Sequence, residues 1–163
     1  PLSAALKAKD EDAAEALLDG GDDPNEVDGL GRNALHMAAQ EGCRLPLFHR
    51  ILGMIHNVNA VTTDMLGSTA LVMAAYHNHL DMVVSLMNHR GIDVNVQNSF
   101  NNTALHLAVS HNRPAIVAQL VSDDRVDTSL KTNKNETPLK MAIRLLGHAE
   151  CTKILREHGA PEE

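Results

Sequence analysis

Residues 104–109 read Ala104-Leu105-His106-Leu107-Ala108-Val109, and variants of this stretch return at nearly constant spacing along the chain. Its leucine belongs to a series whose members lie 33 to 36 residues apart: Leu2, Leu35, Leu71, Leu105 and Leu139. Most copies continue with a step of two small or apolar residues: Ala38-Ala39, Ala74-Ala75, Ala108-Val109 and Ala142-Ile143. A fixed period of this length predicts a solenoid, because one repeat cannot bury its apolar face alone and must stack on its neighbours.

The rest of each copy predicts a pair of helices and a tight turn. Residues that tolerate positive φ stand four positions before four of the leucines: Gly31, Gly67, Asn101 and Asn135. Second apolar stretches with helical spacing follow at 45–52, 80–87, 116–121 and 151–155, and Pro46 and Pro114 fit the first turn of such helices. The residues expected in the core are Leu47, Phe48, Ile51, Met82, Val83, Leu107, Ile116, Val117 and Leu120.

These phrases resemble the ankyrin repeat family, whose signature is T-P-L-H-x-A at this period. The resemblance implies an all-α ankyrin solenoid of helix-turn-helix pairs joined by β-hairpin-like finger loops. It implies one domain over 1–163, with repeats at 1–28 (an N-terminal cap), 29–64, 65–98, 99–132 and 133–163 (a C-terminal cap). One departure is Val72, which stands where the family places His; others are extra residues at 61–63 and 145–147.

Composition limits the function classes. The chain has 163 residues and two cysteines, Cys43 and Cys151, which lie three repeats apart and too far for a disulfide. Free thiols suit the cytoplasm or nucleus. No apolar run approaches the length of a membrane span, so we expect no membrane insertion. An acidic balance and only three aromatic residues, Phe48, Tyr76 and Phe100, argue against nucleic acid.

Acidic residues are concentrated at the start of the chain. Residues 1–28 hold nine Asp or Glu and two Lys, a balance equal to the formal net charge of −7 of the whole chain. One interpretation is a polar cap, which a terminal repeat needs for solubility. The other is a docking edge for a basic segment of a partner.

Motifs for chemistry are missing from the sequence. His36 and His106 occupy the family's T-P-L-H position, where the imidazole is expected to bond to neighbouring turns. The chain has no nucleophile elbow, phosphate loop, dinucleotide fingerprint or zinc spacing. We therefore expect no catalysis, no cofactor and no metal.

The resemblance implies a protein–protein interaction module that binds through its concave face and finger loops, as a monomer. Carried onto this chain, the variable contact positions of the family are Leu30, Arg32, Gln40, Met65, Leu66, Ser68, Tyr76, His77, Ser99, Phe100, Asn102, His111, Lys134 and Glu136. Five of them, Leu30, Met65, Leu66, Tyr76 and Phe100, are large and apolar and could form one stripe, which would favour binding over local packing.

Three alternatives stay open. An inhibitor-type binder of a Rel-like transcription factor is one concrete version of the interaction module. A structural spacer within a longer protein would show no apolar stripe. A small-molecule or metal-dependent function would require Tyr76, His77, His79 and His111 to converge on one pocket. The resemblance also implies possible asparagine hydroxylation at Asn95 and, with a less regular context, at Asn59.

Overall fold

The computed structural model of the chain describes residues 1–162, which form ten helices and contain no strand. One pair of helices falls within each of the five expected repeat ranges. The helices are α1 (Leu2–Lys7), α2 (Glu11–Asp19), α3 (Ala34–Glu41), α4 (Leu45–Met54), α5 (Ala70–Tyr76), α6 (Leu80–Met87), α7 (Ala104–Ser110), α8 (Pro114–Val121), α9 (Pro138–Arg144) and α10 (Ala149–Glu157).

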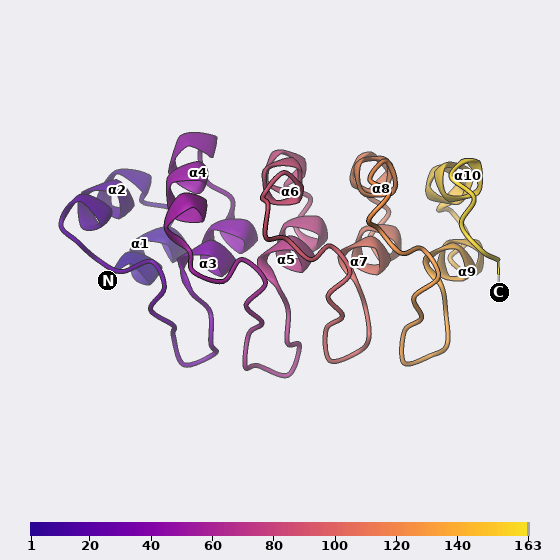
Figure 1. The fold of residues 1–163 in the computed structure, drawn as a ribbon, viewed down its shortest axis with the longest axis horizontal. Coiled ribbons are helices and arrows are strands. Elements are labelled where there is room, and N and C mark those ends of the chain that lie inside the picture. Colours follow the sequence, from indigo (N-terminus) through magenta and orange to yellow (C-terminus); the bar gives the residue numbers. More distant parts are fainter. Residues whose placement is uncertain (163) are drawn as a thin grey trace.

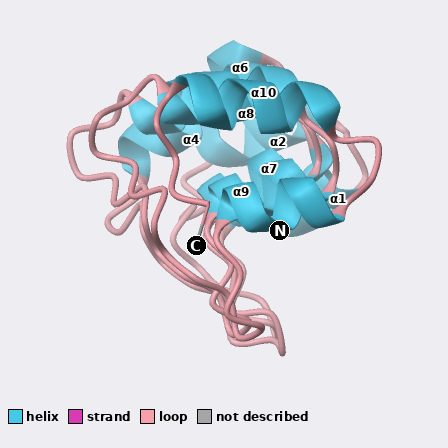
Figure 2. Cartoon of the chain, turned by 90° about the vertical axis from the view of Figure 1, so that its right-hand side faces the viewer, coloured by secondary structure: helices cyan, strands magenta, loops and turns pink. Residues whose placement is uncertain are grey.

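The helices stack in two layers that run along the long axis of the molecule (Figure 1). Each odd-numbered helix packs on the next one, from α1 through α3, α5 and α7 to α9, while α4, α6, α8 and α10 form a second row above them. The loops that lead from one pair to the next project to one side (Figure 2). We call these loops, at 20–33, 55–69, 88–103 and 122–137, fingers 1 to 4, and the surface that they form with the odd-numbered helices the inner face.

Local chemistry sets where the odd-numbered helices begin. Asn33, Thr69, Thr103 and Thr137 are the N-caps of α3, α5, α7 and α9, and each side chain accepts a hydrogen bond from the third backbone N–H of its helix. Pro46 and Pro114 lie in the first turns of α4 and α8, as expected, because those N–H groups have no partner within the helix.

The expected core is confirmed with one exception. The repeat leucines Leu35, Leu71, Leu105 and Leu139 are buried, as are the core positions predicted in α4, α6 and α8. Leu107 packs against the core but is only half-buried, because it also borders a hollow on the inner face. Within residues 1–162 no helix is both long enough and apolar enough to cross a bilayer.

The two family histidines tie neighbouring repeats together. The backbone N–H groups of Asn33 and Thr103 donate to Nδ1 of His36 and His106 respectively, which completes a capping box in each helix. The opposite ring nitrogens therefore donate to the next finger, His36 Nε2 to the carbonyl of Ala60 at 2.8 Å and His106 Nε2 to that of Glu136 at 3.2 Å. The expected structural role of these imidazoles is confirmed.

Candidate functional site

Finger tips place a row of apolar side chains at the edge of the inner face. Each tip turns at a residue with positive φ, with values of 71° at Gly31, 57° at Gly67, 56° at Asn101 and 57° at Asn135. The residue before this turn is Leu30, Leu66 or Phe100 in the first three fingers, with 45%, 50% and 48% of its surface exposed. In the fourth finger the same position holds Lys134.

Backbone hydrogen bonds hold these finger tips to one another. Thr63 donates to the carbonyl of Leu30 at 2.8 Å, Ser99 to that of Leu66 at 3.0 Å, and Asn133 to that of Phe100 at 3.0 Å. Because each bond uses the apolar residue's own carbonyl, the spacing of the row is set by the backbone. The exposed side chains are therefore presented at fixed intervals of one repeat.

A hollow of about 350 Å³ lies between fingers 2 and 3 and the odd-numbered helices behind them. Its apolar lining includes Leu66, Tyr76 and Phe100, three members of the predicted stripe. A second hollow of about 290 Å³ lies between fingers 3 and 4, and Phe100 and Asn102 line both. Phe100 thus stands between two adjacent hollows.

The predicted contact residues are not equally available. Nine are exposed: Leu30, Met65, Leu66, Tyr76, His77, Ser99, Phe100, His111 and Lys134. Arg32, Gln40 and Asn102 are half-buried, while Ser68 and Glu136 are buried with 5% and 8% of their surface exposed. Met65 is 87% exposed but, like Leu30, lines neither hollow, so the structure brings together only part of the expected stripe.

Several lining residues were missed from the sequence. Val72, Met73 and Leu107 supply apolar surface to the larger hollow, and Asp64 and Asn98 supply polar surface. Val72 carried a signal, since it replaces the histidine that α3 and α7 have at this position. Met73 and Leu107 have no such signal, and only the three-dimensional structure shows that part of each side chain lines the hollow. Val27 and Val61, also missed, are exposed finger residues.

Side-chain hydrogen bonds join the finger to the following helix in the second and fifth repeats, on either side of the two hollows. In the second repeat Arg32 donates to Gln40 Oε1 at 3.3 Å and pairs with Asp28 at 2.7 Å. In the fifth repeat Arg144 donates to Glu136 at 2.5 and 3.1 Å. The equivalent positions are Ser68 and Tyr76 in the third repeat and Asn102 and Ser110 in the fourth, and the described structure has no bond between the members of either pair.

The imidazoles near Tyr76 form a row without a common centre. The Tyr76 ring lies 4.3 Å from that of His111 and 4.9 Å from that of His77, while His77 and His79 stack at 6.2 Å between ring centroids. Burial, with the neighbouring His79 and His111, lowers the pKa of His77. Of the four side chains Tyr76, His77, His79 and His111, only Tyr76 and His77 line the larger hollow. The His79 ring lies 3.3 Å from the carbonyl of Gln40.

Among residues 1–162, no three His, Cys, Asp or Glu side chains are arranged to hold a metal ion. The condition set for the small-molecule or metal alternative, convergence of all four side chains on one pocket, is therefore not met.

Acidic residues of the first repeat are largely paired. Arg44 of α4 contacts three carboxylates of α2, namely Glu11, Asp12 at 3.0 Å and Glu15 at 3.7 Å. Arg50 pairs with Asp19 at 2.6 Å. The acidic surface left for a basic partner is then mainly on finger 1, at Asp22, Asp23 and Glu26.

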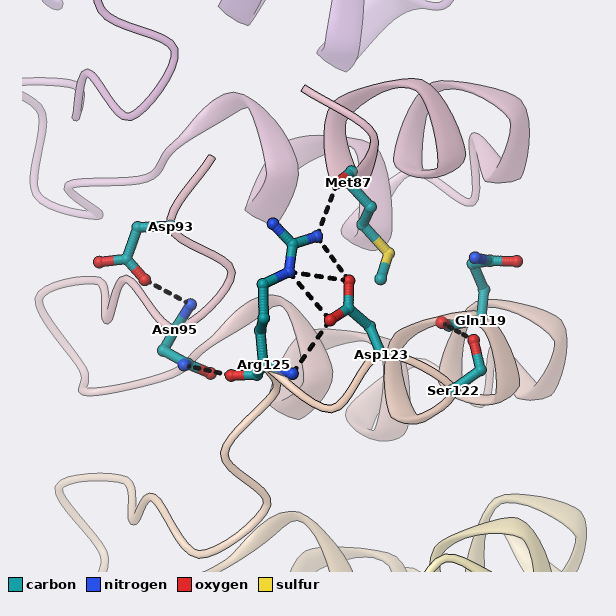
Figure 3. Close-up of polar contacts among 7 residues, drawn as sticks. All are labelled: Met87, Asp93, Asn95, Gln119, Ser122, Asp123 and Arg125. Carbon is teal, nitrogen blue, oxygen red and sulfur yellow. Dashed lines mark hydrogen bonds and ion pairs between the residues drawn. The ribbon is translucent and has the colours of Figure 1, made fainter. Parts of the chain in front are cut away.

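Asn59 and Asn95 occupy the same place in successive repeats and bridge to the next one. The Asn95 amide donates to the carbonyl of Arg125 at 2.8 Å (Figure 3). It also accepts from the N–H of Asp127 at 2.8 Å. Asn59 makes the equivalent bonds to Gly91 and Asp93, each at 2.8 Å. Arg125 itself is fixed by Asp123 and by the carbonyl of Met87 at 2.7 Å (Figure 3).

Comparison with known proteins agrees with this architecture. The family model described as ankyrin repeats (3 copies) matches residues 2–98 and 90–162. The chain belongs to the ankyrin repeat family. The repeats of such solenoids build extended binding surfaces from stacked units. The family assignment is thus consistent with the inner face as the site of interest.

Curated relatives include NF-kappa-B inhibitor alpha from three mammals. The Sus scrofa protein is 36% identical over 100 residues, which cover 60% of this chain and 32% of the relative. The Homo sapiens protein is 35% identical over 108 residues (60% and 31%), and the Rattus norvegicus protein 36% over 107 residues (62% and 33%). The chain spans about a third of the length of the curated relatives it matches.

Proposed function

We propose that the chain is a non-catalytic protein–protein interaction module that binds a partner through the inner face of its third and fourth repeats. The observation that carries this proposal is the 350 Å³ hollow, where Leu66, Tyr76 and Phe100 come together from two fingers and a helix. Large aromatic side chains gathered at the centre of a patch with a polar rim are typical of interface hot spots. A structural spacer would have no use for such a patch.

The test is affinity capture from a native lysate, read by mass spectrometry. The wild-type chain is compared with a Tyr76→Ala, Phe100→Ala double variant and with a Met54→Ala, Leu146→Ala control. The control also removes exposed apolar surface, but outside the two inner-face hollows. Circular dichroism and melting temperature check the fold of each variant. We expect a protein that the wild-type chain and the control capture and the double variant loses.

Equal capture by all three proteins would contradict the proposal. The unpaired finger 1 carboxylates, Asp22, Asp23 and Glu26, would then be the next surface to test, with Lys substitutions and a basic peptide as the probe. Cytoplasm or nucleus is the compartment that we propose, because both cysteines are free. Size-exclusion chromatography with light scattering tests the proposed monomer.

A second candidate, an inhibitor-type binder of a Rel-like transcription factor, is favoured by the similarity to NF-kappa-B inhibitor alpha over 60% of the chain. A direct binding measurement with a purified NF-kappa-B dimer tests it. Binding that Tyr76→Ala, Phe100→Ala abolishes would support this candidate. Absence of binding at micromolar concentration would reject it and leave the broader interaction module in place.

Hydroxylation of Asn95 and Asn59 is a further proposal within this function. It is supported by their equivalent positions in successive fingers and by their part exposure. Peptide mass spectrometry of the chain from cells would detect the added mass of one oxygen atom on either residue, and unmodified Asn at both positions would reject the proposal.

A further inference from the structure

The open part of the inner face is limited to two repeats. The Arg32–Gln40 bridge in the second repeat and the Glu136–Arg144 bridge in the fifth join finger to helix at both ends. Between them, the third and fourth repeats have no such bridge, and there the larger hollow lies. With about 10 Å for each repeat, the unbridged stretch is about 20 Å long, the length of about six residues of extended chain.

The larger hollow is lined mainly by uncharged side chains. Neither α5 nor α7 contains Asp, Glu, Lys or Arg. Asp64 is the one charged residue in the lining, and its Oδ1 already accepts from the Thr62 hydroxyl at 2.7 Å and from the N–H groups of Leu66 and Gly67 at 3.0 Å. Apart from Asp64 the lining is uncharged, so the occupant of this hollow is expected to be a large apolar side chain. An acidic group is excluded, because beside the Asp64 carboxylate it would lose water without gaining a partner.

Polar groups at the rim suit a peptide backbone. Within residues 1–162, the side chains of Tyr76 and Asn102 form no hydrogen bond to another residue, and both line the larger hollow. An extended chain carries N–H and C=O groups that point alternately to its two sides and have no partners within the chain. The Asn102 amide both donates and accepts, so it can pair with either group.

A positive charge without an ion pair lines the open stretch at one end. Lys134 at the tip of finger 4 is exposed, lines the smaller hollow beside Phe100, and forms no ion pair within residues 1–162. Arg144 in the same hollow is already paired with Glu136. Among the residues that line the two hollows, Lys134 is thus the one positive charge without an ion pair, and it lies about one repeat beyond the larger hollow, which gives the site a direction.

On the basis of the proposed function, we propose that the inner face of the third and fourth repeats takes an extended peptide segment of a protein partner. The segment places one large apolar side chain in the hollow of Leu66, Tyr76 and Phe100 and an acidic residue against Lys134. Phe100 separates the two positions by about one repeat spacing. Because side chains of an extended chain alternate between its two faces, the apolar and acidic residues are expected about two or four positions apart in the segment.

Selection from a phage-displayed library of random peptides about 12 residues long, panned on the intact chain, tests the proposal without a known partner. We expect enriched peptides with a Leu, Phe or Trp about two or four positions from an Asp or Glu. Binding of synthetic copies is then measured by fluorescence anisotropy. Phe100→Ala should weaken binding by about tenfold or more, as for a central anchor, and Lys134→Glu by a few-fold at low salt.

Two controls separate direct contact from damage to the fold. Lys153→Glu makes the same charge change at an exposed position of α10 and should leave the affinity unchanged. A peptide with Lys in place of its acidic residue should regain affinity for Lys134→Glu, which a misfolded variant could not allow. Enriched peptides that lack an acidic residue, or that bind Phe100→Ala as tightly as wild type, would overturn the proposal.

Failure of this inference is distinguishable from failure of the proposed function. If lysate capture depends on Tyr76 and Phe100 but no peptide is enriched, the partner binds through a folded surface and the peptide assignment is wrong. If capture also fails to depend on these residues, the proposed function itself falls.

Discussion

The side-chain amide of Asn95 donates to the carbonyl of Arg125 in the next repeat and accepts from the N–H of Asp127, both at 2.8 Å. One side chain thereby satisfies a donor and an acceptor of the neighbouring loop. Asn59 does the same one repeat earlier, and Asn25 bridges in the same way to Met54 and His56. These asparagines form a polar ladder along the solenoid, next to the apolar core.

Replacement of Asn95 by Ala should lower the free energy of unfolding by about 1–3 kcal/mol, because both bonds are lost and the loop groups lose their partners. Asn88→Ala is the matched control, since Asn88 is exposed and lies outside the ladder. Urea denaturation measures both. A loss for Asn95→Ala no larger than for Asn88→Ala would show that the ladder does not stabilise the stack.

Gly31 and Gly29 lie in the same finger but differ in the space around them. A Cβ on Gly31 would lie 2.8 Å from the backbone nitrogen of Thr63, and the residue has φ of 71°. Nothing lies within 4 Å of a Cβ on Gly29. We expect Gly31→Ala to cost more than the roughly 1–2 kcal/mol of a left-handed alanine, and Gly29→Ala to melt near wild type. Equal melting temperatures would contradict the close contact between fingers 1 and 2.

Acid should destabilise the fold through its two capping histidines. Burial lowers the pKa of both His36 and His106 below the usual 6.5. The unfolded chain therefore binds protons first as the pH falls through 6.5, so stability present above that pH is lost below it. We expect the melting temperature to fall between pH 7.5 and 5.5. A His36→Asn, His106→Asn double variant, though less stable, should show a smaller decrease, and an unchanged slope would contradict this assignment.

Cys43 should react slowly in the folded chain. Burial, with the negative charge of Glu11, raises the pKa of its thiol to about 12. Cys151 is fully buried, and burial raises its pKa as well. Because the thiolate is the reactive form, iodoacetamide at pH 8 should modify both cysteines far faster in urea than in buffer. Rapid labelling of Cys43 in the native chain would show that the turn between α3 and α4 opens readily.

The sequence predicted the fold well because its signals are local and repeated. Residues with positive φ stand where Gly31 and Asn101 were expected, and the capping role of His36 and His106 follows from their place in the repeated phrase. Such features depend on a few neighbouring residues. They are therefore readable without the tertiary structure.

The candidate site was harder to predict because it depends on contacts between repeats. Glu136 has the sequence of an exposed turn residue, yet its ion pair with Arg144 buries it. Leu107 was predicted as core and nevertheless borders the hollow. The acidity of the first repeat suggested an open docking edge, but Arg44 and Arg50 of α4 pair with much of it. Spacing along the chain does not reveal any of these pairings.

The most direct test of the central claim is a hydrogen–deuterium exchange footprint of the chain with and without the protein identified by capture. An interface on the inner face predicts slower exchange in 64–77 and 98–111, which contain the parts of fingers 2 and 3 that line the hollow and helices α5 and α7. It predicts unchanged exchange in α4, α6 and α8. Protection confined to those second-layer helices, or to residues 1–28, would contradict the account.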